Sequence, residues 1–207
     1  GANNTAHGSR ALGSNTTASN NTAVGRDALL LNTTGTQNVA VGALSLDANT
    51  TGSYNTALGE KSLSTNILGS KSTAVGTFSL FNQNPASAVD MYNVAVGYDA
   101  GNAVTTGTEN TLIGGLAGDA LTVGNSNVAV GTYALSADTK GDRNVAIGRA
   151  ALQVQNFTST TDSYNTAVGY GAGELVTTGT NNTFVGGQAG DATDDGGRKV
   201  SPICKLR

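Results

Sequence analysis

The chain has 207 residues, of which 38% are hydrophobic but only 5% aromatic, and its formal net charge is −3. It contains no basic stripe that could follow a phosphate backbone, so we expect no nucleic acid as a partner. No apolar run approaches the roughly 20 residues of a membrane span, so we expect no membrane insertion by this segment. Because the apolar volume comes mainly from Ala, Val and Leu, we expect a thin core rather than a wide globular interior.

A five-residue motif, Asn-(Thr/Val)-Ala-(Val/Leu/Ile)-Gly, recurs eleven times from the N-terminus onward. Most steps from one final glycine to the next are 17 residues long, as from Gly8 to Gly25. Two of the steps are 21 residues long. A fixed period of this length is typical of a solenoid, in which each repeat is one turn of a coil. We therefore predict an all-β parallel β-solenoid with 17-residue coils over residues 1–192. Residues 193–207 are predicted to be a C-terminal tail or the start of a neck or next domain.

The motif itself predicts a short strand that runs from position −4 to position 0, where position 0 is the final glycine. β-Branched residues dominate positions −3 and −1, and glycine ends the run. Alternation places Asn, Ala and Gly on one face and Thr or Val with an aliphatic residue on the other. Neither face is charged, which is typical of a strand that is buried on both faces. One face can line the coil interior, and for the other we expect a layer supplied by another copy of the chain.

The remainder of each coil has a weaker pattern. Position +3 is always small and position +4 is Leu or Gly, so positions +3 to about +7 predict a second strand. A turn such as Thr33-Thr34-Gly35 follows it. Parallel stacking of the coils, about 4.8 Å apart, predicts a rod of roughly 50 Å.

Position −4 is asparagine in ten of the eleven repeats, and Ser72 is the exception. Stacked side-chain amides can form a hydrogen-bonded ladder along the axis. Alternatively, asparagine at this position tolerates the geometry of the turn before the strand. The sequence leaves both readings of this structural Asn ladder open. Its members are Asn4, Asn21, Asn38, Asn55, Asn93, Asn110, Asn127, Asn144, Asn165 and Asn182.

The two 21-residue steps create a 72-residue superperiod, and their extra residues fall in segments 81–92 and 153–164. Insertions at one coil position map to loops on one side of a solenoid. These loops are predicted either to pack locally or to contact a receptor or other partner. Their candidate contact residues are Phe81, Met91, Tyr92, Phe157 and Tyr164.

The sequence holds no pattern that indicates catalysis, a cofactor or a metal. The single histidine, His7, excludes histidine clusters and histidine-dependent triads. Asp191, Asp194 and Asp195 could bind Ca²⁺ weakly, but a solvated acidic terminus is the preferred interpretation. Cys204 is the only cysteine, which excludes an intrachain disulfide. We therefore predict a protein that is not an enzyme, without cofactor or metal.

The repeats resemble the YadA-like head repeats of trimeric autotransporter adhesins and, more closely, the related repeats of bacteriophage tail fibres. Segments 21–35 (NTAVGRDALLLNTTG) and 165–186 carry the resemblance best. It implies a left-handed β-roll with three identical chains around a common axis, in an extracellular position on a bacterial cell surface or in a virion tail fibre. The coil is longer than the usual autotransporter head repeat.

Function follows as an expectation from this architecture. We predict a structural and adhesive segment of a homotrimeric fibre, which acts as a rigid spacer and attaches to a host-surface receptor or glycan. One alternative is an ice-binding β-solenoid, because threonine pairs stack in register. A weaker alternative is a segment of a polysaccharide-cleaving tailspike, which would need paired carboxylates at a suitable separation.

Overall fold

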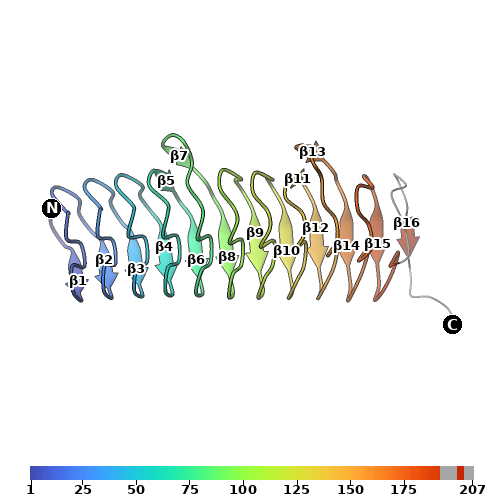
Figure 1. Cartoon of the computed structure of the whole chain (residues 1–207), viewed down its shortest axis with the longest axis horizontal. Helices are drawn as coiled ribbons and strands as arrows, with labels where there is room; N and C mark the ends of the chain where they lie inside the picture. The colour runs from blue at the N-terminus through green and yellow to red at the C-terminus, as the bar shows by residue number, and fades with distance from the viewer. Residues whose placement is uncertain (192–199, 203–207) are drawn as a thin grey trace.

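About eleven turns of chain stack along one axis and form a rod (Figure 1). The structure is a computed structural model that describes residues 1–191 and 200–202. Its described residues contain strands and turns but no helix. The prediction of an all-β parallel β-solenoid is confirmed. The 17-residue coil is confirmed as well, because each strand pairs with the equivalent positions of the next coil, as Val128 does with Val145.

One parallel sheet of twelve strands runs along the rod. Each strand occupies positions −3 to −1 of the motif, and Ala95 pairs with Leu112 at the same position of the next coil. Because every coil contributes the same three positions, the register stays constant through both 21-residue steps. The strands are, in sheet order, β1 (Thr5–His7), β2 (Thr22–Val24), β3 (Val39–Val41), β4 (Thr56–Leu58), β6 (Thr73–Val75), β8 (Val94–Val96), β9 (Thr111–Ile113), β10 (Val128–Val130), β12 (Val145–Ile147), β14 (Thr166–Val168), β15 (Thr183–Val185) and β16 (Val200–Pro202).

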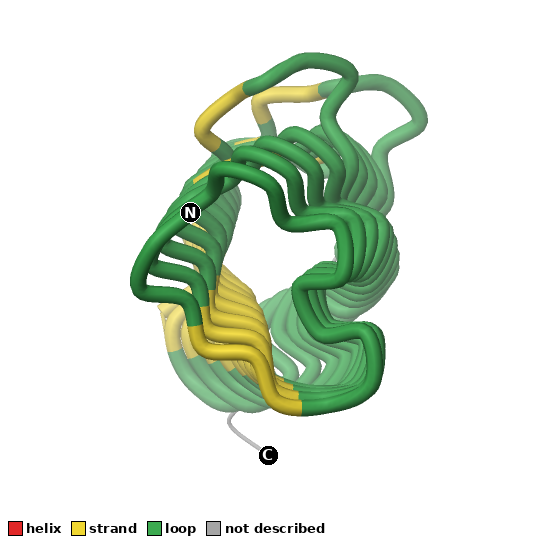
Figure 2. The backbone as a smooth tube through the Cα atoms, turned by 90° about the vertical axis from the view of Figure 1, so that its left-hand side faces the viewer, coloured by secondary structure: helices red, strands yellow, loops and turns green. Residues whose placement is uncertain are grey.

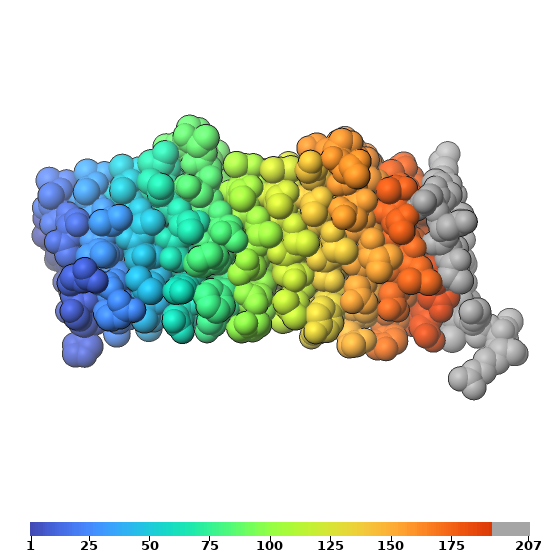
Figure 3. All heavy atoms as spheres, viewed as in Figure 1, coloured from blue at the N-terminus to red at the C-terminus, as the bar shows by residue number. Residues whose placement is uncertain are grey.

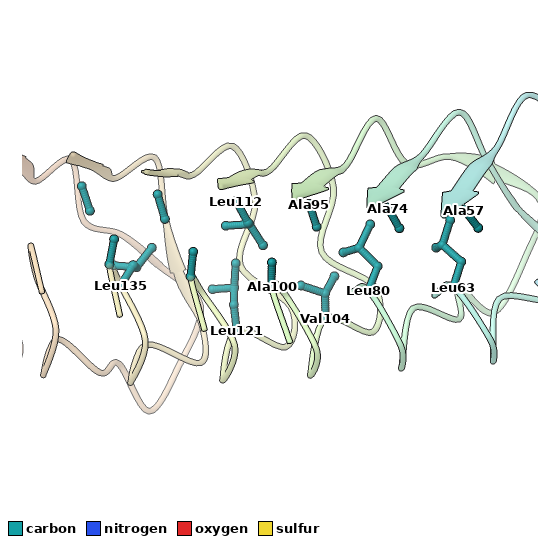
Figure 4. Packing of buried hydrophobic residues seen from close by; sticks show 14 of the residues in the cluster. Ala57, Leu63, Ala74, Leu80, Ala95, Ala100, Val104, Leu112, Leu121 and Leu135 are labelled. Carbon is teal, nitrogen blue, oxygen red and sulfur yellow. The ribbon is translucent and has the colours of Figure 1, made fainter. Parts of the chain in front are cut away.

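Each turn of the backbone encloses an interior (Figure 2), and apolar side chains fill it. The alanine at position −2 points inward and is fully buried, as at Ala57 and Ala74. Across the interior it faces the leucine at position +4, such as Leu63 or Leu80 (Figure 4). The structure thus decides which face of the strand lines the coil: it is the face of Asn, Ala and Gly.

The predicted second strand is wrong, because positions +1 to +6 form turns. Positions +2 and +4 both take a left-handed backbone conformation, as at Leu44 (φ 57°) and Leu46 (φ 49°). This conformation costs roughly 1–2 kcal/mol for a residue with a side chain. Hydrogen bonds to the two neighbouring coils offset the cost: the Leu44 amide donates to the Arg26 carbonyl (2.9 Å) and the Leu46 amide to the Ser62 carbonyl (3.1 Å).

Glycine at position 0 is required by a close approach between coils. Gly97 has φ +139°, and a Cβ built on it would lie 2.5 Å from the carbonyl oxygen of Gly114 in the next coil. Any side chain here would force the coils apart, because the contacting atom belongs to the backbone. The repeated glycine therefore sets the spacing between coils.

Two coils fill the interior differently. Where Leu112 replaces the usual alanine at position −2, glycine replaces leucine at position +4 in the same coil and in the preceding one (Gly118 and Gly101). A Cβ on Gly118 would lie 2.8 Å from Leu112 Cδ2, and one on Gly101 would lie 2.7 Å from Leu112 Cδ1. The large side chain thus occupies the volume that leucine vacates, which keeps the packing dense.

The second such coil, one superperiod later, repeats this exchange with a larger side chain. Phe184 stands at position −2, and Gly173 and Gly190 stand at position +4. A Cβ on Gly190 would lie 2.3 Å from two ring carbons of Phe184. Packing inside the coil therefore follows the superperiod, not only the 17-residue period.

The two inserted segments extend from one side of the coil (Figures 2 and 3). Each pairs its end with the preceding coil through a two-stranded parallel ladder. The first ladder joins β5 (Gly69–Ser70) to β7 (Val89–Asp90), and the second joins β11 (Gly141–Asp142) to β13 (Thr161–Asp162). The loops are thereby anchored at their bases by main-chain pairing.

Candidate interaction surfaces

The outer face of the long sheet is apolar and exposed in the single chain. It is formed by the side chains at positions −3 and −1. The aliphatic residues at position −1 are partly exposed to solvent in the single chain. For example, Val96 is 36%, Ile113 37% and Ile147 38% exposed. In the strands of the long sheet from β1 to β15, positions −3 and −1 hold only Thr, Val, Leu, Ile and His7. We call this surface the outer sheet face.

From Asn21 onward, the asparagines at position −4 are buried inside the coil, and they connect three parts of the backbone. The Asn21 side-chain oxygen accepts from the Asn38 amide of the next coil (2.9 Å). The Asn38 side-chain amide donates across the same coil to the Gly52 carbonyl (2.8 Å). These residues lie outside the left-handed positions, which fall on position −5 before them. The side chains therefore hold the strand to the opposite turn and to the next strand.

Direct bonds between side-chain amides occur in one stretch of this ladder. Asn127 Nδ2 donates to Asn110 Oδ1 and Asn144 Nδ2 donates to Asn127 Oδ1, both at 3.1 Å. Elsewhere the backbone amide of the next asparagine is the donor, as for Asn55 on Asn38. A buried polar group costs free energy unless it is hydrogen-bonded, and here both ends of the amide are used.

A second interior ladder, at position +7, was not anticipated from the sequence. Asn49 Nδ2 donates to Asn32 Oδ1 (2.8 Å) and to the Gly52 carbonyl (3.0 Å). In the inserted coils a longer glutamine takes this position: Gln83 Oε1 accepts from Asn93 Nδ2 (3.0 Å). Gln83 thereby joins the position +7 ladder to the position −4 ladder through a side-chain hydrogen bond. The change from Asn to Gln at position +7 was the available signal.

The coil before the second inserted segment carries a buried carboxylate at position +7, Asp138, where the coil before the first inserted segment has Asn66. Gln155 Nε2 donates to Asp138 Oδ2 (2.6 Å), and the amide of Gly141 donates to Oδ1 (2.9 Å). Burial raises the pKa of the Asp138 carboxyl, although the hydrogen bonds from Gln155 and the backbone oppose this rise. This carboxylate is stabilised by dipoles and not by an ion pair, which makes its charge costly.

The five candidate contact residues of the loops do not form one surface. Met91 is fully buried and Phe157 is 5% exposed, so neither can reach a partner, and both belong to the local packing of their loops. Phe81 is half-buried and stacks edge-on against Phe78 (5.7 Å between centroids). Only Tyr92 (51% exposed) and Tyr164 (49% exposed) remain clearly accessible.

The threonine pairs that motivated the ice-binding alternative do not present free hydroxyls at both positions. The first threonine of the pair donates its hydroxyl along the axis: Thr16 Oγ1 to the Thr33 carbonyl and Thr33 Oγ1 to the Thr50 carbonyl, both at 3.1 Å. These hydroxyls stabilise the stacking of the turns, so no regular array of free hydroxyls follows from the pairs.

Several side chains that sequence reasoning singled out remain apart. His7 is exposed at the end of β1. Asp191 is placed, whereas Asp194, Asp195, Cys204 and the tail 193–199 and 203–207 lie outside the described residues. In the described part of the chain, no three His, Cys, Asp or Glu side chains lie together, and no pocket indents the surface. The described residues also contain no helix long and apolar enough to cross a membrane.

Comparisons with protein-family models, curated proteins and solved structures all end without a match. The resemblance to YadA-like and tail-fibre repeats therefore rests on the motif alone.

Proposed function

We propose that the chain is a segment of an extracellular homotrimeric fibre, in which three left-handed rolls pack through their outer sheet faces. The segment acts as a rigid spacer on a bacterial cell surface or in a virion tail fibre, and it presents its sides to a host surface. The coil hand and the number of chains follow from the resemblance, as does the extracellular position.

The observation that carries the proposal is the outer sheet face. It continues along the sheet from β1 to β15, roughly 50 Å at about 4.8 Å per strand. Soluble monomers rarely expose contiguous apolar patches of more than a few hundred Å². A second copy of the same chain is the natural occupant, because it offers an apolar strip of the same length and the same repeat.

A spacer function also agrees with the interior. Every coil is hydrogen-bonded to its neighbours through the strand, the turns and the Asn ladder. Each repeat contacts only its neighbours, so added coils lengthen the rod without altering its cross-section.

The test is the mass of the folded chain in solution by size exclusion with multi-angle light scattering. We expect three times the chain mass of 20.6 kDa. A folded monomer at 20.6 kDa contradicts the proposal, and circular dichroism on the same sample verifies that the chain is folded.

A further inference from the structure

The base of each inserted loop carries the same three kinds of side chain: a cation, a carboxylate and a tyrosine. The cation comes from the preceding coil, and the other two come from the end of the loop. Corresponding members lie one superperiod apart. We call these groups the loop-base clusters; they are Lys71, Asp90 and Tyr92 in the first, and Arg143, Asp162 and Tyr164 in the second.

In the first cluster the three side chains fix one another. Lys71 Nζ donates to Asp90 Oδ2 (2.7 Å) and to Tyr92 Oη (3.1 Å), and lies 5.1 Å from the centroid of the Tyr92 ring. The Tyr92 hydroxyl also donates to Asp90 Oδ2 (3.4 Å). The hydrogen bonds from Lys71 to Asp90 and Tyr92 raise the pKa of Lys71, so the cation keeps its charge.

The second cluster repeats this arrangement with arginine. Arg143 Nη1 is hydrogen-bonded to Asp162 Oδ1, and its guanidinium carbon lies 5.6 Å from the centroid of the Tyr164 ring. The Tyr164 hydroxyl donates to Asp162 Oδ2 (3.5 Å). Both tyrosines are held in place while about half of each side chain stays exposed.

Loop anchoring does not account for this repetition. Between the loop bases, residues 85–89 (PASAV) and 157–161 (FTSTT) share only their serine, although both segments connect the same points. The parallel ladders β5–β7 and β11–β13 already fix the loop ends. An exposed ion pair contributes at most about 1 kcal/mol to the free energy of unfolding. Stability therefore does not explain why both clusters contain a cation, a carboxylate and a tyrosine.

The size and the charge of the clusters indicate their ligand. A protein partner would need about 800 Å² per side and would contact the loop tips, which differ between the two loops. A small molecule that binds tightly needs a concave pocket, and the described surface has none. Each cluster has no net charge, and it combines one aromatic ring with hydrogen-bond donors and acceptors. This combination suits one polyhydroxylated ring of a polymer.

We propose that both loop-base clusters bind sugar residues of an extended, uncharged glycan, each tyrosine ring stacking on one sugar while the acid and the cation hydrogen-bond its hydroxyls. The two clusters lie four coils apart, about 19 Å along the rod. One polymer lying along the rod therefore engages both, and the second contact becomes intramolecular. This inference rests on the proposed function, since it gives the host-attachment function a ligand class and a site.

The experiment uses the full chain on an array of neutral bacterial and host polysaccharides, each printed untreated and after periodate oxidation of its vicinal diols. Affinity for the best ligand is then measured by biolayer interferometry. Tyr92→Ala and Tyr164→Ala are tested singly and together. Tyr133→Ala is the matched control, because Tyr133 is an exposed tyrosine beside a cation, 5.9 Å from Arg149, but has no counterpart one superperiod away.

We expect binding to at least one untreated polysaccharide and loss of that binding after oxidation. Each single variant should weaken binding at least about 10-fold, and the double variant at least about 100-fold, as loss of avidity requires. Tyr133→Ala should bind as the parent does, and all variants should keep the parent's circular dichroism spectrum. No binding on the array, or full binding by the double variant, overturns the proposal.

Light scattering on the same samples separates this inference from the proposed fibre. A folded monomer that binds through both tyrosines overturns the trimer and supports the glycan site. A trimer that binds none of the polysaccharides overturns the glycan site and supports the trimer.

Discussion

The long sheet has two apolar faces, and the single chain covers only one of them. Inside, Ala129 on β10 is fully buried against the coil's own interior, where the facing turn supplies Leu135. Outside, Ile113 on the neighbouring strand β9 is 37% exposed. One chain therefore closes the coil by itself, whereas the outer face remains exposed in the single chain.

The largest expected effect comes from placing a charge on the inner face. Ala129→Asp buries a carboxylate in an interior that offers this position only apolar neighbours. An uncompensated buried charge costs several kcal/mol, so the melting temperature should fall by about 10 °C or more. The same charge at the exposed Thr106 should change it by little. Thermal circular dichroism measures both, and equal melting temperatures would contradict the assignment of the inner face.

The next effect tests how the interior is filled. Leu112→Ala leaves a cavity, because Gly101 and Gly118 cannot occupy the vacated volume, and should cost about 2–5 kcal/mol in free energy of unfolding. Adding Gly101→Leu and Gly118→Leu recreates the arrangement of the other coils, with Ala at −2 and Leu at +4, and should restore most of the loss. Urea unfolding of the single and triple variants checks this, and additive losses would refute the exchange.

Charged substitutions on the outer sheet face should have a smaller effect on the stability of the coil. Val96→Asp, Ile113→Asp and Ile147→Asp together place charges on side chains that are already solvent-accessible in the single chain. Surface substitutions usually change stability by no more than about 0.5 kcal/mol each. We expect a coil with an unchanged circular dichroism spectrum and a monomeric mass by light scattering. A triple variant that remains trimeric would show that the chains pack elsewhere.

The smallest effect concerns Asp138, the buried carboxylate in the coil before the second inserted segment. Burial raises the pKa of Asp138 above the ordinary value of 3.8 in the unfolded chain. The folded state thus favours the protonated form, and the chain loses stability as the pH rises from about 4 through the folded pKa. Asp138→Asn supplies the side-chain amide of Asn66, the equivalent residue in the coil before the first inserted segment, which accepts from Gln83 Nε2 and donates to the Gly69 carbonyl.

We therefore expect the Asp138→Asn variant to melt a few degrees higher than the parent at pH 7 and to approach it at pH 3. Asn66→Asp is the reciprocal change, and it should introduce a loss of stability at pH 7. Melting curves at both pH values decide the matter, and a pH-independent difference would contradict the ionisation argument.

The glycine period, the motif strand and the parallel stacking could all be predicted from the sequence, because alternation and spacing are local properties. The strand was predicted for positions −4 to 0 and is found at positions −3 to −1. The second strand could not be excluded, since Leu46 and its counterparts disfavour the left-handed conformation that they adopt. Only the bonds between coils and the burial of those leucines make that conformation the better one. Sequence reasoning also misplaced Met91 and Phe157, whose size suggested contact residues and whose burial depends on the loop path.

The repeated motif and its 17-residue step were enough to predict the stacked coils, because a fixed period places equivalent residues above one another in successive coils. The tertiary structure decided which face of each strand turns inward, because the inner volume admits alanine opposite leucine, or leucine and phenylalanine opposite glycine. It also decided that positions one superperiod apart, which are distant in the sequence, repeat the same packing and the same exposed clusters. Stacking brings together residues that are one period apart in the sequence. Their side chains must fit one another in volume and in hydrogen bonding, and a pattern within a single coil does not show this.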